Sequence, residues 1–148
     1  KAAAALQDIA NRTQYIVMAN DLFHLRRGGR ISVATAMVGT MLQIKPLFTF
    51  NRNGKLCVTE KIKGQLKAMH QLVKIFLKNT AGHPSFVYIA QADCAALACE
   101  LRAMIQDECP QAIIKIGYIG PVIGTHTGPG TLGFGYLCPT EKPVIKQD

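Results

Sequence analysis

The hydrophobic positions along this chain predict alternating strands and helices. Apolar runs of strand length stand at residues 14–18, 47–50, 56–62, 86–90, 113–119 and 132–137. Segments with helical periodicity or helix-forming composition stand at 1–11, 20–28, 32–44, 65–79 and 93–109. The alternation of the two kinds of segment indicates an α/β fold.

Turn and cap residues mark the boundaries of these segments. Asn53-Gly54 supplies the positive-φ positions of a hairpin between residues 47–50 and 56–62. Ser32 and Asp93 are predicted to cap helices. Neither an internal repeat nor a long linker divides the chain. Residues 1–148 are therefore expected to form a single α/β domain with a mixed β-sheet of about six strands and packed helices.

Composition narrows the class of protein. Hydrophobic residues make up 49% of the 148 residues and charged residues 18%, which is typical of a globular domain. No apolar run approaches the roughly 20 residues that a transmembrane helix needs. The five cysteines form no CxxC pair and indicate reduced thiols, so a cytoplasmic location is expected. Because Lys1 stands where a methionine would begin a protein, we interpret the chain as a fragment or a cleaved product.

The net charge of +8 and the pI near 9.5 favour an anionic partner. Helical spacing places four lysines on one stripe, namely Lys63, Lys67, Lys74 and Lys78. Apolar residues occupy the opposite face, namely Leu66, Met69, Leu72, Val73, Phe76 and Leu77. The stripe has two interpretations: a solvated helix face over a packed core, or a surface that contacts an anionic membrane or an acidic protein. Nucleic acid is disfavoured, since tryptophan is absent and aromatics are only 7%.

Glycines gather near the end of the chain. Seven of the 13 lie between Gly117 and Gly135, around Thr125-His126-Thr127. Glycine lets a backbone approach a ligand closely, so a loop here would present two hydroxyls and an imidazole to a carboxylate or phosphate. The alternative is that His126 bonds its own loop and the threonines cap backbone groups in the turn.

Motifs for catalysis are missing from the sequence. It contains no Gly-x-Ser-x-Gly elbow, no His-Glu-x-x-His, no Walker A sequence and no Rossmann fingerprint. No motif supplies a cysteine or serine nucleophile that His126 could activate. The chain is therefore expected to bind a molecule rather than to act as an enzyme, and no cofactor or metal is predicted.

Two segments together resemble the DegV family. The first runs Asp-Leu-Phe-His-Leu-Arg-Arg-Gly-Gly-Arg-Ile-Ser over residues 21–32, followed by Gly39 and by Leu-Gln-Ile-Lys-Pro at 42–46. The second is Gly-Thr-His-Thr-Gly-Pro-Gly at 124–130. The resemblance covers residues 14–137 and implies the C-terminal domain of a two-domain bacterial protein. Such proteins hold one long-chain fatty acid near the domain junction, and some present its carboxylate to a separate fatty-acid kinase.

The resemblance also implies site residues. The polar network around the fatty-acid head group would comprise Gly29, Arg30, Thr125, His126, Thr127 and Gly128. The planar fork of Arg30 suits a carboxylate bidentately. Small and flexible apolar residues at 33–42 suit an acyl tail, although the same pattern is typical of core packing. His24 stands where the family more often has tyrosine, and no role is predicted for it. The alternative function is a basic module that binds anionic membrane or nucleic acid through the lysine stripe.

Overall fold

The computed structural model describes residues 1–20, 22–29, 43–51, 54, 56–83 and 85–140. The predicted helix after Ser32 lies outside these residues. The described helices are α1 (Ala2–Arg12), α2 (Leu22–Arg27), α4 (Gln65–Thr80), α5 (Ala95–Glu108) and α6 (Pro121–Thr127). The strands are β1 (Thr13–Met18), β2 (Ile44–Phe50), β3 (Leu56–Lys63), β4 (Phe86–Ala92), β5 (Ile113–Tyr118) and β6 (Thr131–Leu137).

The strands form one mixed six-stranded sheet in the order β3-β2-β1-β6-β4-β5. Neighbours pair antiparallel except for β4 and β5, which are parallel. Parallel neighbours need a crossover connection, and α5 supplies it. The predicted α/β class with a mixed sheet is confirmed. The predicted hairpin is the β2–β3 pair, where Gly54 has φ +72°.

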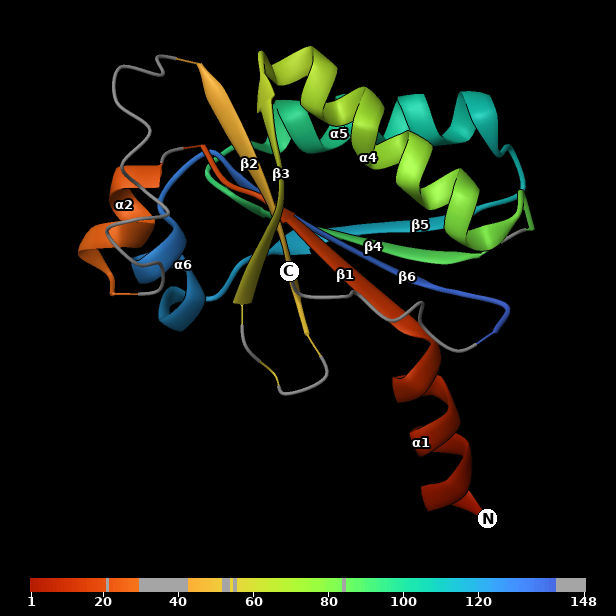
Figure 1. Ribbon diagram of the computed structural model, residues 1–148. Helices are drawn as coiled ribbons and strands as arrows, with labels where there is room; N and C mark the ends of the chain where they lie inside the picture. Colours follow the sequence, from red (N-terminus) through yellow and green to blue (C-terminus); the bar gives the residue numbers. More distant parts are fainter. Residues whose placement is uncertain (21, 30–42, 52–53, 55, 84, 141–148) are drawn as a thin grey trace.

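The main core lies between the sheet and the two long helices α4 and α5, which lie side by side over one face of it (Figure 1). Residues of each strand alternate between the faces, so Ile16 and Met18 of β1 point into this core. Phe76 of α4 meets Phe134 and Tyr136 of β6 edge to face, with ring centroids 5.8 and 5.3 Å apart.

A smaller cluster lies on the opposite face of the sheet. Leu25 of α2 packs there with Ala19 and Phe48, and Val17 joins them from β1. Because Val17 stands between two residues of the main core, its side chain must point to the other side. This cluster holds α2 against the end of the sheet where α6 also lies (Figure 1).

Two local predictions are wrong. Asp93 does not cap α5: it has φ +53°, the helix begins after Cys94, and the side-chain Oε1 of Gln91 accepts the Cys94 N–H at 2.7 Å. Lys63 does not belong to the predicted lysine stripe of the helix, because it is the last residue of β3. Gly64, with φ +94°, separates it from α4.

The apolar face of α4 is predicted correctly except at its first turn. Met69, Leu72, Val73 and Phe76 are buried, whereas Leu66 is 55% exposed. Helical side chains point toward the N-terminus of their helix, so a residue in the first turn projects beyond the packed surface.

Candidate functional site

The glycine-rich segment is a short helix rather than the predicted loop. Pro121 opens α6, where its missing N–H is not needed by the helix and its fixed φ is favourable. The helix ends at Gly128, which has φ +78°. Thr125, His126 and Thr127 therefore form the last turn of a helix, and the three side chains diverge around its axis instead of sharing one loop face.

The two threonine hydroxyls are already bonded. Thr125 Oγ1 donates to the carbonyl of Pro121 at 2.7 Å, and Thr127 Oγ1 donates to the carbonyl of Ile123 at 3.1 Å. A hydroxyl has one hydrogen to donate, so neither group has a second hydrogen for a carboxylate. In this arrangement both threonines satisfy backbone carbonyls of their own helix.

His126 packs against Gly28 at the end of α2. A Cβ atom at Gly28 would lie 2.9 Å from Nδ1 of His126 and 3.3 Å from its Cα. Only a glycine therefore lets the histidine sit where it does. The two segments of the family signature, 98 positions apart in the chain, meet at this contact between α2 and α6.

His24 and Gly128 form a second contact of the same kind, in the reverse direction. A Cβ atom at Gly128 would lie 2.8 Å from the His24 ring. His24 Nε2 lies 2.9 Å from the carbonyl oxygen of Thr125, and since a carbonyl only accepts, Nε2 donates this hydrogen bond. Sequence reasoning gave His24 no role, yet it holds the last turn of α6. The sequence signal for this role was the position of His24, one helical turn before the Gly28-Gly29 pair.

The backbone after α6 has few hydrogen atoms left to donate. The N–H of Gly128 bonds to the carbonyl of Gly124 at 2.8 Å, and the N–H of Gly130 bonds to that of Ala92 at 2.7 Å. Pro129 has no N–H. These glycines therefore do not form an anion-binding cradle of backbone amides. Gly128 instead makes room for a side chain, and so does Gly130, whose Cβ would lie 2.9 Å from the side chain of Asn20.

One of the two ring nitrogens of His126 is enclosed by the protein. Its Nδ1 is buried and has no hydrogen-bond partner among the described residues. A buried polar atom without a partner costs about 1–3 kcal/mol whether it is a donor or an acceptor. Nε2 is the other ring nitrogen, and it is the atom through which this histidine can contact a ligand.

The other predicted site residues come from the turn after α2. Gly29 has φ +69°, its N–H donates to the carbonyl of Arg26 at 2.9 Å, and a Cβ atom there would meet nothing within 4 Å. The positive φ of this turn is the reason that a glycine stands at position 29. Arg30 lies outside the described residues.

Exposed apolar side chains lie on α6 and at the end of the preceding strand, β5. Tyr118 is 82% exposed, Val122 78% and Ile123 60%. Within the residues that the structure describes, no group of three or more His, Cys, Asp or Glu side chains is placed to hold a metal ion. Among the same residues, no helix has both the length and the apolar character needed to cross a membrane.

The chain belongs to the DegV family. The model of this family, whose members are described as uncharacterised proteins, matches residues 1–138. The DegV domain-containing protein CPE0026 of Clostridium perfringens is 37% identical over 139 residues, which are 93% of this chain and 48% of that protein. The protein spr1415 of Streptococcus pneumoniae is 36% identical over 91% of this chain and 46% of its own length. The chain thus spans about half the length of the relatives it matches.

Solved structures share the fold. The DegV family protein Cg2579 of Corynebacterium glutamicum aligns with a TM-score of 0.83 and 28% identity, over 92% of this chain and 52% of that chain. SAG1342 of Streptococcus agalactiae, described as a fatty acid binding DegV family protein, aligns with a TM-score of 0.80 and 30% identity over 93% and 49%. DegV of Bacillus subtilis, described as a fatty acid binding protein, aligns with a TM-score of 0.75 and 29% identity. This alignment covers 91% of this chain and 48% of that chain.

Proposed function

We propose that this chain is the C-terminal domain of a longer two-domain protein and that it holds the carboxylate of one long-chain fatty acid beside α6. Membership of the DegV family supports the proposal, as do fatty-acid-binding relatives of the same fold at 29–30% identity. The half-length coverage of those relatives agrees with a second domain.

The position of His126 against Gly28 is the main structural support for the proposal. The contact with Gly28 closes Nδ1, so Nε2 faces the ligand and donates to one carboxylate oxygen. The family resemblance adds Arg30 to the same site, because a guanidinium fork suits a carboxylate. Thr125 and Thr127 act indirectly, because their hydroxyls fix the last turn of α6 that carries His126.

The acyl chain supplies most of the affinity, since each buried methylene contributes about 0.8 kcal/mol. The head-group contacts then fix which end of the molecule lies at α6. The exposed side chains of Tyr118, Val122 and Ile123 offer an apolar surface that the rest of the longer protein covers.

The family resemblance extends the proposal to a partner. The bound carboxylate is presented to a separate fatty-acid kinase, which converts it to an acyl phosphate. In this account the chain positions the substrate in the cytoplasm, contributes no cofactor and performs no chemistry. The kinase step is separable from binding, because a protein that retains fatty acid can still fail to support phosphorylation.

A comparison of two histidine variants tests the binding site. His126→Ala in the full-length protein removes a hydrogen bond to a charged group, worth about 1.5–3 kcal/mol, so affinity for oleate falls about tenfold to a hundredfold. His70→Ala is the matched control, because His70 is exposed on α4 and its Nδ1 bonds the carbonyl of Leu66 in its own helix. Titration with a fluorescent fatty acid gives both affinities. Equal affinity in the two variants would remove His126 from the site.

The same two variants separate binding from presentation. Purified kinase from the same organism, ATP and loaded protein are mixed, and acyl phosphate is measured at saturating fatty acid. Presentation predicts acyl phosphate formation with the wild type and with His70→Ala, and a reduced rate with His126→Ala. A wild-type protein that binds fatty acid tightly and supports no phosphorylation would leave the binding function standing and refute the kinase partnership.

A further inference from the structure

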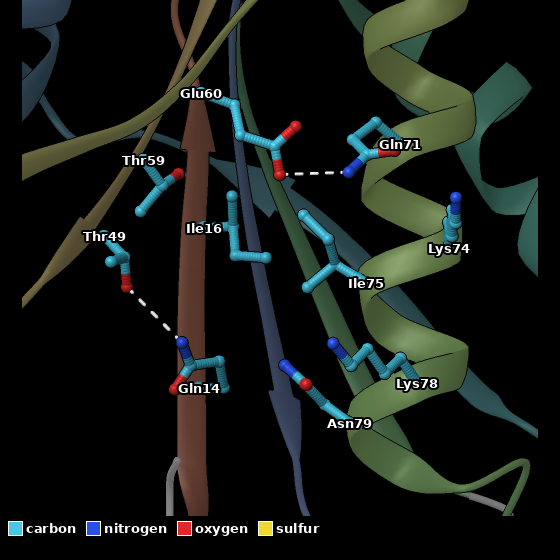
Figure 2. A pocket seen from close by; sticks show the side chains of 10 residues that line it. All are labelled: Gln14, Ile16, Thr49, Thr59, Glu60, Gln71, Lys74, Ile75, Lys78 and Asn79. Carbon is cyan, nitrogen blue, oxygen red and sulfur yellow. Dashed lines mark hydrogen bonds between the residues drawn. The ribbon is translucent and has the colours of Figure 1, made fainter. Parts of the chain in front are cut away.

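A groove lies on the face of the sheet opposite α2, between α4 and strands β1, β2 and β3 (Figure 2). Its volume is about 400 Å³. Ile16 and Ile75 contribute apolar surface, and the side chains of Gln14 and Thr49 lie along the strand side. The groove is separate from the proposed fatty-acid site, which lies by α2 and α6 at the other face and end of the sheet.

The charges at the groove are unbalanced. Glu60 is the acidic residue in its lining, and its Oε1 accepts a hydrogen bond from Gln71 Nε2 at 3.0 Å. Lys74 and Lys78 line the same groove, and among the described residues neither forms an ion pair. Figure 2 shows the Lys78 side chain directed from α4 toward the groove. The lining therefore carries two lysines against one glutamate, and neither lysine is paired with that glutamate.

The lysines have a regular spacing along α4. Lys67, Lys74 and Lys78 share one stripe of the helix with Gln71, and all three lysines are exposed. Residues four apart on a helix are about 6 Å apart along its axis. Alternate residues of an extended chain are about 6.6–6.8 Å apart. An extended segment with acidic side chains at alternate positions therefore matches the spacing of Lys74 and Lys78.

The buried face of α4 argues against a membrane as the occupant. A helix that lies on a bilayer inserts its apolar face into the lipid. The apolar face of α4 is already occupied, because Met69, Leu72 and Phe76 have no exposed surface. A concave groove also presents its polar side chains to a narrow chain better than to a flat surface.

We propose that the groove between α4 and strands β1–β3 is a docking site for an extended acidic segment of a partner protein. Lys74 and Lys78 pair with carboxylates at alternate positions of that segment, and Lys67 extends the contact along α4. Gln14 and Thr49 form the floor of the groove, where Thr49 Oγ1 already donates to the carbonyl of Tyr15 at 2.6 Å, so the ion pairs with the lysines are the main contacts. The groove shares no residue with the proposed head-group site at α2 and α6.

Peptide binding tests the proposal. The probe is a fluorescein-labelled twelve-residue peptide with glutamate alternating with threonine, and anisotropy is measured against the protein at low and at physiological salt. Lys74→Gln/Lys78→Gln is expected to weaken binding about 2- to 30-fold, the range for two exposed ion pairs. Lys63→Gln/Lys115→Gln removes the same charge away from the groove and is expected to change binding less than twofold. Circular dichroism melting checks that both variants are folded.

Four further probes distinguish binding in the groove from general electrostatic attraction. A peptide with glutamine in place of glutamate and a peptide with the glutamates in one block should both bind more weakly than the alternating one. Vesicles of phosphatidylglycerol and phosphatidylcholine and a single-stranded oligonucleotide test the other anionic classes. Equal loss of peptide affinity in the two double variants, equal binding of block and alternating peptides, or a Lys74/Lys78 effect on vesicles or oligonucleotide alone would overturn the proposal.

Discussion

Replacing Gly28 by alanine tests whether the position of His126 determines binding. The added Cβ would lie 2.9 Å from His126 Nδ1, about half an ångström closer than ordinary contact, which begins near 3.4 Å. The backbone is not the obstacle, because Gly28 is not among the glycines with positive φ. The imidazole must therefore move, and overpacking of this kind costs about 1–3 kcal/mol of stability.

Displacement of His126 moves Nε2 away from the carboxylate. We expect Gly28→Ala to lower the affinity of the full-length protein for oleate by about the same factor as His126→Ala, tenfold to a hundredfold. The assay is fluorescent fatty-acid titration, with thermal unfolding measured on the same samples.

A glycine outside the site provides the matched control. Gly82, which follows α4, has φ +73° and open space around a Cβ atom, so Gly82→Ala costs about 1–2 kcal/mol through backbone strain alone. It should lower the melting temperature comparably and leave affinity unchanged. If Gly28→Ala binds oleate as tightly as the wild type, or if both glycine variants lose affinity in proportion to their stability, the position of His126 does not determine binding.

Two further substitutions probe other contacts. His24→Phe keeps a ring against Gly128 but removes the hydrogen bond to the Thr125 carbonyl. Amide hydrogen exchange in the last turn of α6 should therefore accelerate, and fatty-acid affinity should fall by less than in His126→Ala. Unchanged exchange would contradict a positioning role for His24. Burial raises the pKa of Tyr136 strongly, with a smaller opposing effect from its hydrogen bond with Asn79, so the neutral phenol is favoured in the folded state. This contribution to stability is complete below the unfolded-state pKa near 10 and is lost as the pH rises above it. Tyr136→Phe should cost about 0.5–1.5 kcal/mol at pH 7 and flatten the loss of stability between pH 10 and 12, and an equally steep alkaline transition would argue against the assignment.

The sheet was predictable because its strands have simple signals. Each buried strand is a short apolar run, and Asn53-Gly54 marks the hairpin. The strand order was not predictable from these signals, since it depends on contacts between distant segments. The β6 strand, for example, lies between β1 and β4 and pairs with both.

The sequence pointed to the two segments that meet at α2 and α6, but not to the geometry of their contact. The signature segments pointed to α2 and α6, but the glycine content of residues 117–135 indicated a loop where Pro121 starts a helix. The sequence also did not show the structural role of each glycine. Whether a glycine serves a turn or admits a neighbouring side chain depends on what lies opposite in space, as His126 does at Gly28 and His24 does at Gly128.

Mass spectrometry of the purified full-length protein, native and then denatured with lipid extraction, tests whether this protein carries a fatty acid. We expect one long-chain fatty acid per protein, released on denaturation and restored when fatty acid is added back. A protein that is empty as purified and does not take up added fatty acid would contradict this expectation.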